Sequence, residues 1–192
     1  MLCRRINILF GAVLATHLLL AEVFVTFPDR KELRSPDGRF VVRSVEHVPG
    51  AREFSGVFRS LVLEDTATGS KRGLYNYVGR IAMAWSGNEC LIATDYVGKR
   101  TSRALVFRMK YLDESMVIDK TYLASQVTGD LRAQLELNDH VFVEAFGVEK
   151  RDLMLRVWGY GAHNPKGFRV QCTYDLINGN TSCWENSGSS KK

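Results

Sequence analysis

The clearest sign of fold class is the stretch RIAMAWSGNECLIATDYVGKRTSRALVFRMK, residues 80–110. It contains three short apolar runs, Ile81–Trp85, Cys90–Thr94 and Ala104–Phe107, each rich in β-branched or aromatic residues. A tight turn at Ser86–Glu89 separates the first two runs, and a polar segment at Asp95–Arg103 separates the last two. Short apolar runs punctuated by Gly, Asn, Asp and Ser are typical of antiparallel strands. The stretch therefore predicts antiparallel β-structure, with Asp95–Arg103 as a loop.

A turn followed by an apolar strand occurs three times along the chain. Ser35-Pro36-Asp37-Gly38 precedes the first copy, Ser86–Glu89 the second and Phe146–Lys150 a weaker third. Each copy continues into a polar loop and a second apolar strand. Two of these second strands end in turns of the form Asp-x-x-x-Gly, at 65–69 and 175–179. Repeats with this spacing indicate blade-like β-meanders.

The S-P-D-G turn at 35–38 and the D-x-x-T-G turn at 65–69 resemble the WD40-like repeats of TolB-type propellers. Trp85, Thr94-Asp95 and Val157-Trp158-Gly159 are similar to segments of small exported propeller-like bacterial proteins. This resemblance implies a propeller-like fold and no particular activity. A closed propeller needs at least four blades of about 40 residues each, and the chain shows three modules. We therefore expect a mainly β fold, either an open partial propeller or an irregular antiparallel sheet or sandwich.

Residues 113–138 lack strand patterns. Asp119 is expected to cap a short helix over 120–127, and Asp130 to cap a second one over 131–137, with Leu131 and Leu135 on one face. We expect these helices to cover a face or an edge of the sheet; a partner-binding amphipathic helix is the alternative.

The N-terminus has the composition of an export signal. Arg4 and Arg5 precede a mostly apolar stretch, Ile6–Phe27, which is about long enough to span a bilayer. We expect residues 1–27 to be a cleaved signal peptide or a membrane anchor, with a hydrophobic helix. A polar linker at 28–34, a β domain at 35–185 and a disordered tail at 186–192 would follow. The β domain is then expected outside the cytoplasm, either periplasmic or anchored to the inner membrane.

An exported chain meets an oxidising compartment, where disulfides persist. Cys172 and Cys183 flank the turn at 176–179, which would place them opposite each other on adjacent strands, where a disulfide could form. Cys90 lies in an apolar run and is expected to be a small core residue. The strand runs supply the other expected core residues: Trp85, Leu91, Ile92, Leu105, Phe107, Val141, Val143, Leu155, Val157 and Trp158.

Motifs for catalysis or cofactors are absent from the sequence. It has no G-x-S-x-G, and Gly159-Tyr160-Gly161 opens no helix, unlike a dinucleotide fingerprint. His47, His140 and His163 stand apart from other metal ligands. The net charge of +5, or about +3 without Arg4 and Arg5 (24 basic against 21 acidic residues), is too low to indicate nucleic-acid binding. The sequence favours a non-catalytic module without metal or cofactor over a hydrolase-like enzyme with a loop-assembled site.

The loops that join the two strands of each module should leave the sheet at one end, because the modules repeat. These loops, His47–Phe58, Asp95–Arg103 and Tyr160–Gly167, carry the candidate binding residues Arg52, Tyr96, Lys99, Arg100, Arg103, Tyr160, His163 and Lys166. Loops on a rigid sheet often bind partners, and Arg and Tyr are enriched at interface anchors. We expect a protein partner or an acidic or polar ligand there; alternatively, these are solvated loop charges. A further hypothesis is pairing through an open sheet edge, with a second copy or another protein.

Overall fold

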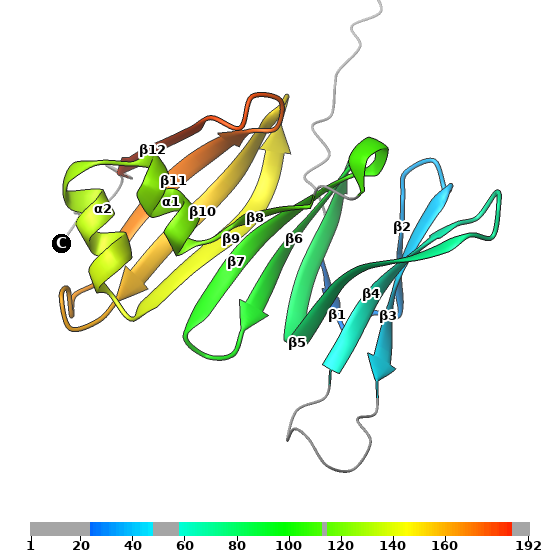
Figure 1. Ribbon diagram of the computed structural model, residues 1–192, viewed down its shortest axis with the longest axis horizontal. Coiled ribbons are helices and arrows are strands. Elements are labelled where there is room, and N and C mark those ends of the chain that lie inside the picture. The colour runs from blue at the N-terminus through cyan, green and yellow to red at the C-terminus, as the bar shows by residue number, and fades with distance from the viewer. Residues whose placement is uncertain (1–23, 48–57, 113–114, 186–192) are drawn as a thin grey trace, which may run out of the picture.

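A computed structural model describes residues 24–47, 58–112 and 115–185 of the chain. Its strands form an open 12-stranded sheet in the order β12-β11-β10-β9-β7-β6-β5-β4-β3-β2, with β1 paired to β5 and β8 to β7 (Figure 1). The mainly β, open architecture expected from the sequence is confirmed. In chain order the elements are β1 (Val25–Phe27), β2 (Glu32–Arg34), β3 (Phe40–His47), β4 (Phe58–Asp65), β5 (Lys71–Ser86), β6 (Cys90–Val97), β7 (Thr101–Arg108), the 3₁₀ turn η1 (Met109–Tyr111), β8 (Met116–Ile118), α1 (Lys120–Gln126), α2 (Gly129–Leu137), β9 (His140–Glu149), β10 (Asp152–Tyr160), β11 (Phe168–Asp175) and β12 (Thr181–Glu185).

The sheet divides into three antiparallel units. The first unit contains β2, β3, β4 and the first half of β5, and the second contains the rest of β5 with β6 and β7. The long strand β5 serves both, because residues 71–78 pair with β4 and residues 79–86 pair with β6. The third unit contains β9 to β12 and joins β7 through two parallel residue pairs, Thr101–Val141 and Ser102–Phe142.

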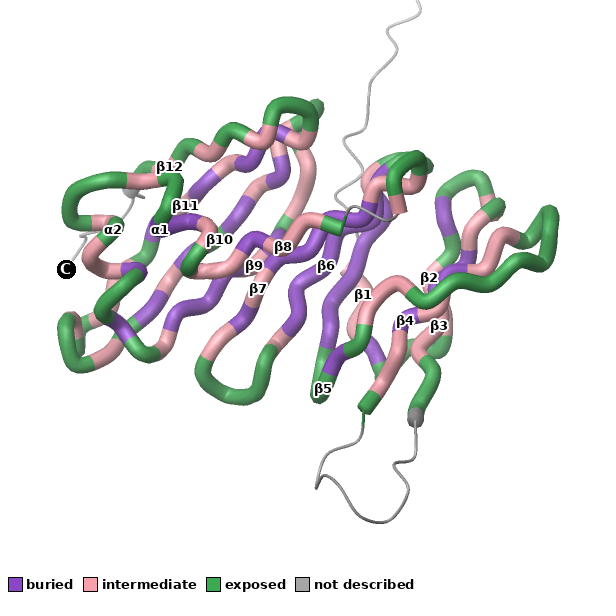
Figure 2. The backbone as a smooth tube through the Cα atoms, viewed as in Figure 1, coloured by how far each residue is buried: buried purple, intermediate pink, exposed green. Residues whose placement is uncertain are grey.

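Two hydrophobic clusters hold the units together. One combines side chains of the first and second units, such as Leu61 on β4 with Leu91 and Phe107. The other combines the second and third units with the helices, where Leu123 and Leu135 pack with the third unit's inner face. Figure 1 shows α1 and α2 lying over the third unit, so the helices cover a sheet face as expected. Figure 2 shows the buried residues concentrated in the strands and the exposed residues at the turns.

The expected core is confirmed except at Trp158. The other nine residues are buried, and so is Cys90. Trp158 is partly exposed, because side chains alternate along β10 and its buried side chains are Leu153, Leu155 and Val157. Its indole instead stacks on the ring of Phe142, on the face turned away from the helices.

One of the two expected helix caps is present. The Asp119 carboxylate accepts a hydrogen bond from the Tyr122 backbone N–H at 2.9 Å, so this cap is confirmed. The expected Asp130 cap is wrong, because Thr128 is the N-cap residue and α2 begins at Gly129. Asp130 therefore lies in the first turn of α2, where a negative charge complements the helix dipole.

The β domain begins earlier than expected. Residues 25–27 pair with 81–83 of β5, and the Phe27 side chain is fully buried. The expected linker at 28–34 contains β2, which pairs with β3 and packs Leu33 against the core, although charged residues surround it in the sequence. The hydrophobic N-terminal helix and the C-terminal tail lie outside the described residues, except that Val25–Phe27 belong to the sheet. Among the helices of the described part, none has the length and apolar character needed to cross a membrane.

The expected loop at 95–103 is also wrong. The strands β6 and β7 continue through it and leave only residues 98–100 as a turn. Polar residues occur inside these strands because their side chains have partners: the Thr94 hydroxyl accepts from the Ala145 N–H, and the Ser102 hydroxyl bonds to the Val143 backbone. These bonds attach β9 to the second unit.

The Cys172–Cys183 pair forms a disulfide. The two residues lie directly opposite each other on β11 and β12, with their Cα atoms 4.0 Å apart. The spacing around the 176–179 turn thus placed the two thiols correctly.

Candidate functional site

Turns from all three units meet at the end of the sheet opposite the candidate loops. The Asp37 N–H, in the turn before β3, donates to the Asn88 side chain in the turn before β6, at 3.1 Å. The Arg108 guanidinium, at the end of β7, donates to the Leu176 carbonyl in the turn after β11. The first unit is thereby joined to the second, and the second to the third, at their tips.

A cavity of about 840 Å³ lies between these turns, and we call it the turn basin. Its volume is within the range of ordinary ligand sites. Five basic residues line it against two acidic ones, Asp37 and Glu89. The basic residues are Arg39, Arg108, Lys110, Lys150 and Arg151.

Two of the basin's arginines are held in equivalent ways. Arg39 pairs with Asp65 at 3.1 Å, and Arg151 pairs with Asp175 at 3.0 Å. In both units the residue after the aspartate donates its N–H to the arginine carbonyl, at 2.8 Å in the first and 2.9 Å in the third. The glycine four residues after the aspartate has a left-handed φ, +70° at Gly69 and +74° in the third unit. Both Asp-x-x-x-Gly turns expected from the sequence are therefore present and alike.

Hydrogen bonds to the aspartates of these turns favour their ionised form. A hydrogen bond from the Arg39 side chain lowers the pKa of Asp65 below its usual value. Hydrogen bonds from the backbone N–H groups of Ile177 and Asn178, with Arg151 nearby, lower the pKa of Asp175. Both turns are thus built to hold a carboxylate charge beside an arginine.

In the second unit the acidic and the basic residue exchange positions. The Met109 N–H donates to the Glu89 carbonyl at 2.9 Å, so Glu89 occupies the arginine position and Arg108 the aspartate position. Within the part of the chain that the structure describes, no carboxylate lies within ion-pair distance of Arg108, Lys110 or Lys150. The turn basin therefore holds three cations that form no ion pair with a described carboxylate, although Asp37 and Glu89 also line it.

Lys150 has a strained backbone. Its φ is +59°, a left-handed conformation, and the first unit has Gly38 (φ +72°) at the equivalent position, also two residues before the strand. Holding a residue with a Cβ in this conformation costs about 1–2 kcal/mol. Such strain often marks a functional position, and here it places a cation at the basin.

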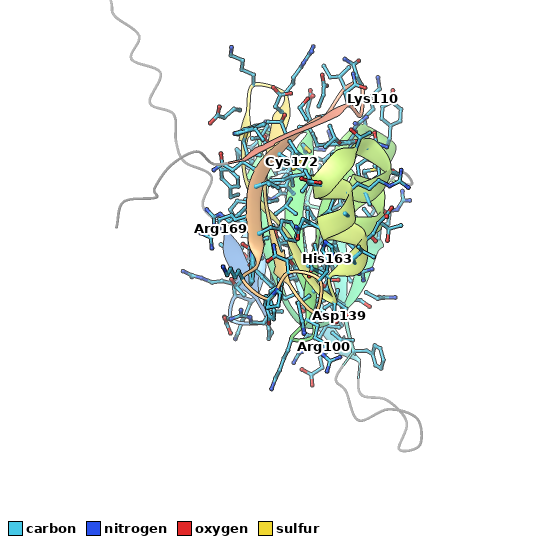
Figure 3. All side chains as sticks on the ribbon, turned by 90° about the vertical axis from the view of Figure 1, so that its left-hand side faces the viewer. Arg100, Lys110, Asp139, His163, Arg169 and Cys172 are labelled. Carbon is cyan, nitrogen blue, oxygen red and sulfur yellow. A yellow bond between two sulfur atoms is a disulfide. The ribbon has the colours of Figure 1, made fainter. Side chains whose placement is uncertain are left out.

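The two candidate loops that the structure describes, at 98–100 and after β10, lie at one end of the sheet. The register pairs Thr101 with Val141 and His140 with Tyr160, so the 98–100 turn and the loop after β10 leave from the same end. Figure 3 shows Arg100 at this end and Lys110 at the other. Arg52 lies outside the described residues.

Two of the candidate residues have structural partners. Arg103 donates to the Asp95 carboxylate at 3.1 Å, and the Tyr75 hydroxyl donates to the same oxygen at 2.7 Å. Asp95 is 2% exposed, and burial together with this bond raises the pKa of Tyr75. Tyr96 lies half-buried under the Arg80 guanidinium, 5.4 Å from its ring centroid. Tyr96 therefore belongs to β6 and Arg103 to β7, and neither lies in a loop.

The remaining candidates are divided between two places. Lys99 and Arg100 are exposed in the β6–β7 turn, and His163 is exposed after β10. Tyr160 stacks on His140 and, with Lys166, lines a second cavity of about 420 Å³. The structure thus brings Tyr160 and Lys166 together and leaves the others apart.

The turn basin was missed at the sequence level. The repeat argument that placed the loops at one end also places the turns before each first strand at the other end. Arg39, Lys150 and Arg151 occur in or beside those turns, so part of this signal was present in the sequence, whereas Arg108 and Lys110 follow the second strand of their module. Only the convergence of the turns could not be foreseen.

The turn basin is lined mainly by basic and apolar side chains. The described residues that line it include no histidine, and no group of three or more His, Cys, Asp or Glu residues suited to a metal occurs in the described ranges. The basin provides two arginines held by aspartates, three cations without an ion pair among the described residues, and partly exposed apolar side chains. Comparisons with protein-family models, curated proteins and solved structures found no match to this chain, so its ligand has to be inferred from these residues.

Proposed function

We propose that the protein is a non-catalytic binding module that works outside the cytoplasm and holds an acidic segment of a partner protein in the turn basin. The observation that carries this proposal is the meeting of three turns around five basic side chains, three of which have no carboxylate partner among the described residues. Arginine and lysine at such a site bind carboxylates through charge-assisted hydrogen bonds.

A peptide fits the basin better than a small anion does. Ile177 is 66% exposed and Tyr111 is 48% exposed, and both line the basin with the half-buried Phe40 and Val148. These apolar side chains would pack against the partner's aliphatic or aromatic residues, while the cations pair with its carboxylates. Charge complementarity of this kind sets orientation and association rate.

The location outside the cytoplasm is supported by two observations. The basic and apolar composition of the N-terminal segment resembles an export signal. The Cys172–Cys183 disulfide is of the kind that persists in oxidising compartments.

Titration calorimetry with a deca-glutamate peptide tests the proposal. The full-length protein should bind this peptide at low salt, and binding should weaken as salt is added. A Lys110→Glu/Lys150→Glu variant, whose side chains are exposed, should bind about tenfold more weakly or worse. The matched control is Lys99→Glu/Arg100→Glu, which makes the same charge change at the other end of the sheet.

Retained binding by the control and loss by the basin variant would support the turn basin. Equal loss in both variants would mean a non-specific charge effect, and loss in the control alone would assign binding to the loop end. Either result, or no binding by the wild type, would contradict the proposal. The thermal midpoints of both variants should stay close to wild type.

A further inference from the structure

We propose that the second cavity, at the β10–β11 hairpin, binds an acidic saccharide, with Trp158 against the sugar ring and Lys166 and Arg169 against its carboxylate. This site is separate from the turn basin and does not depend on the function proposed for it. The cavity is lined by residues 158–160 and 165–169. Figure 3 shows Arg169 on the side of the molecule away from the helices.

The outer face of the third unit is unusually aromatic for a sheet face that no described element covers. Antiparallel sheets normally place polar residues on such a face. Here Phe146, Tyr160 and Trp184 are 36%, 42% and 41% exposed. Exposed aromatic patches of this kind mark binding surfaces.

Trp158 is held with one face turned toward the cavity. Its ring stacks on Phe142 of β9 with centroids 3.9 Å apart and planes 14° apart. Phe142, Trp158 and Arg169 lie in one row across β9, β10 and β11. Because Phe142 covers the face toward β9, the other face of the indole is directed toward β11 and the cavity. An indole face held this way is a platform for the C–H groups of a sugar ring.

The cavity favours a negative charge. Lys166 and Arg169 line it, and the described residues of its lining include no carboxylate. If a second copy of the chain docked through this face, Lys166 and Arg169 would meet the same cations of the other copy. Like-charge repulsion makes a second copy a poor occupant. Besides the rings of Trp158, Tyr160 and Phe168, the lining consists of Pro165, two glycines and the two cations. A saccharide acid suits this lining because its carboxylate can meet the cations while its ring C–H groups meet the indole.

Close backbone packing fixes the cavity in place. A Cβ at Gly159 would lie 2.5 Å from the His140 carbonyl oxygen, and one at Gly167 would lie 2.9 Å from the Gly159 carbonyl oxygen. The Asn164 side chain donates to the Gly167 carbonyl at 3.0 Å and to Gln134 of α2 at 3.1 Å. A loop tied to both strand and helix is pre-organised, which lowers the entropic cost of binding.

Tryptophan fluorescence and calorimetry with trigalacturonate test the proposal on the full-length protein. We expect trigalacturonate to change the fluorescence of the wild type, and we expect Trp158→Ala and Lys166→Ala/Arg169→Ala to weaken its binding about tenfold. Trp184→Phe, on the same face, should leave binding unchanged. Lys166 is an exposed loop residue. The single variant Lys166→Ala should therefore leave the fold intact and test the contribution of this cation alone.

Four outcomes would overturn the proposal. One is no binding of trigalacturonate, and another is binding that Lys166→Ala leaves unchanged. A third is equal binding of a neutral galactose trisaccharide, which would remove the role of the cations, and the last is equal binding of benzoate, which would indicate an aromatic-acid site. The variant Lys110→Glu/Lys150→Glu should keep its trigalacturonate binding, because the turn basin is a different site.

Discussion

Both ends of the sheet carry positive side chains, and the two ends use them differently. At the loop end, Arg103 is bound to the buried Asp95, and the exposed Lys99 and Arg100 stand on a hairpin tip. At the basin end, Arg108, Lys110 and Lys150 surround a single cavity. The difference shows that charge in a loop is a weak sign of a site unless the fold brings several such charges together.

The geometry of the tips explains this difference. At the basin end the units are linked by side-chain hydrogen bonds, from Asp37 to Asn88 and from Arg108 to Leu176. At the loop end, no such bond joins the β6–β7 turn to the β10–β11 loop among the described residues; the bonds of that loop run within itself and to α2 and Asn138. The hairpin tips are thus tied together at one end of the sheet and not at the other.

Removal of Arg103 should have the largest effect on stability and none on the basin. Arg103→Ala leaves the Asp95 carboxylate buried without its cation, at a cost of about 3 kcal/mol of unfolding free energy. Arg100→Ala, three residues earlier and exposed, should change stability by less than about 0.5 kcal/mol. Urea denaturation measures both, and deca-glutamate binding should persist in both variants. Equal stabilities would mean that the Arg103–Asp95 pair is not structural.

Lowering the pH should reduce the contribution of Asp175 to the free energy of unfolding. The folded-state pKa of Asp175 is lowered, so its contribution to stability is fully present above the unfolded-state pKa of about 3.9. That contribution is lost as the pH falls through the folded-state pKa. The stability difference between wild type and Asp175→Asn should therefore be greatest near neutral pH and shrink as the pH falls below about 5. A difference that is constant with pH would contradict the assignment.

Replacement of Lys150 by glycine should raise the stability of the protein and lower its affinity for the acidic peptide. Lys150→Gly should raise the unfolding free energy by about 0.5–1 kcal/mol, since glycine accepts a left-handed φ but loses more entropy on folding. The same variant should bind deca-glutamate more weakly. The matched change in the first unit, Gly38→Lys, should destabilise the protein, because Gly38 also has a left-handed φ. No atom lies within 4 Å of a Cβ added there, so the backbone conformation alone would cause the loss. A gain of binding in Lys150→Gly would argue against a role for this cation.

Local features were predicted well. The strands around Trp85, the Asp119 cap and the turns at 65–69 and 175–179 depend on neighbouring residues, as does the register that joins Cys172 to Cys183. Errors occurred where tertiary partners override composition. Asp95 and Ser102 appeared to be loop residues because they are polar, but they bond within and between units, and the expected linker at 28–34 is drawn into the sheet by Leu33.

The sequence by itself determined a mainly β chain, because side-chain alternation, turn chemistry and caps act over a few residues. It also contained the cations of the turn basin and the aromatic residues of β9 and β10. Only the tertiary structure decided which of these groups meet. Arg39, Arg108 and Lys150 are tens of residues apart, and they line one cavity because the units pack through their two hydrophobic clusters. The packing also buries Asp95, and its cross-strand neighbour Arg103 therefore forms an ion pair with it instead of facing a ligand.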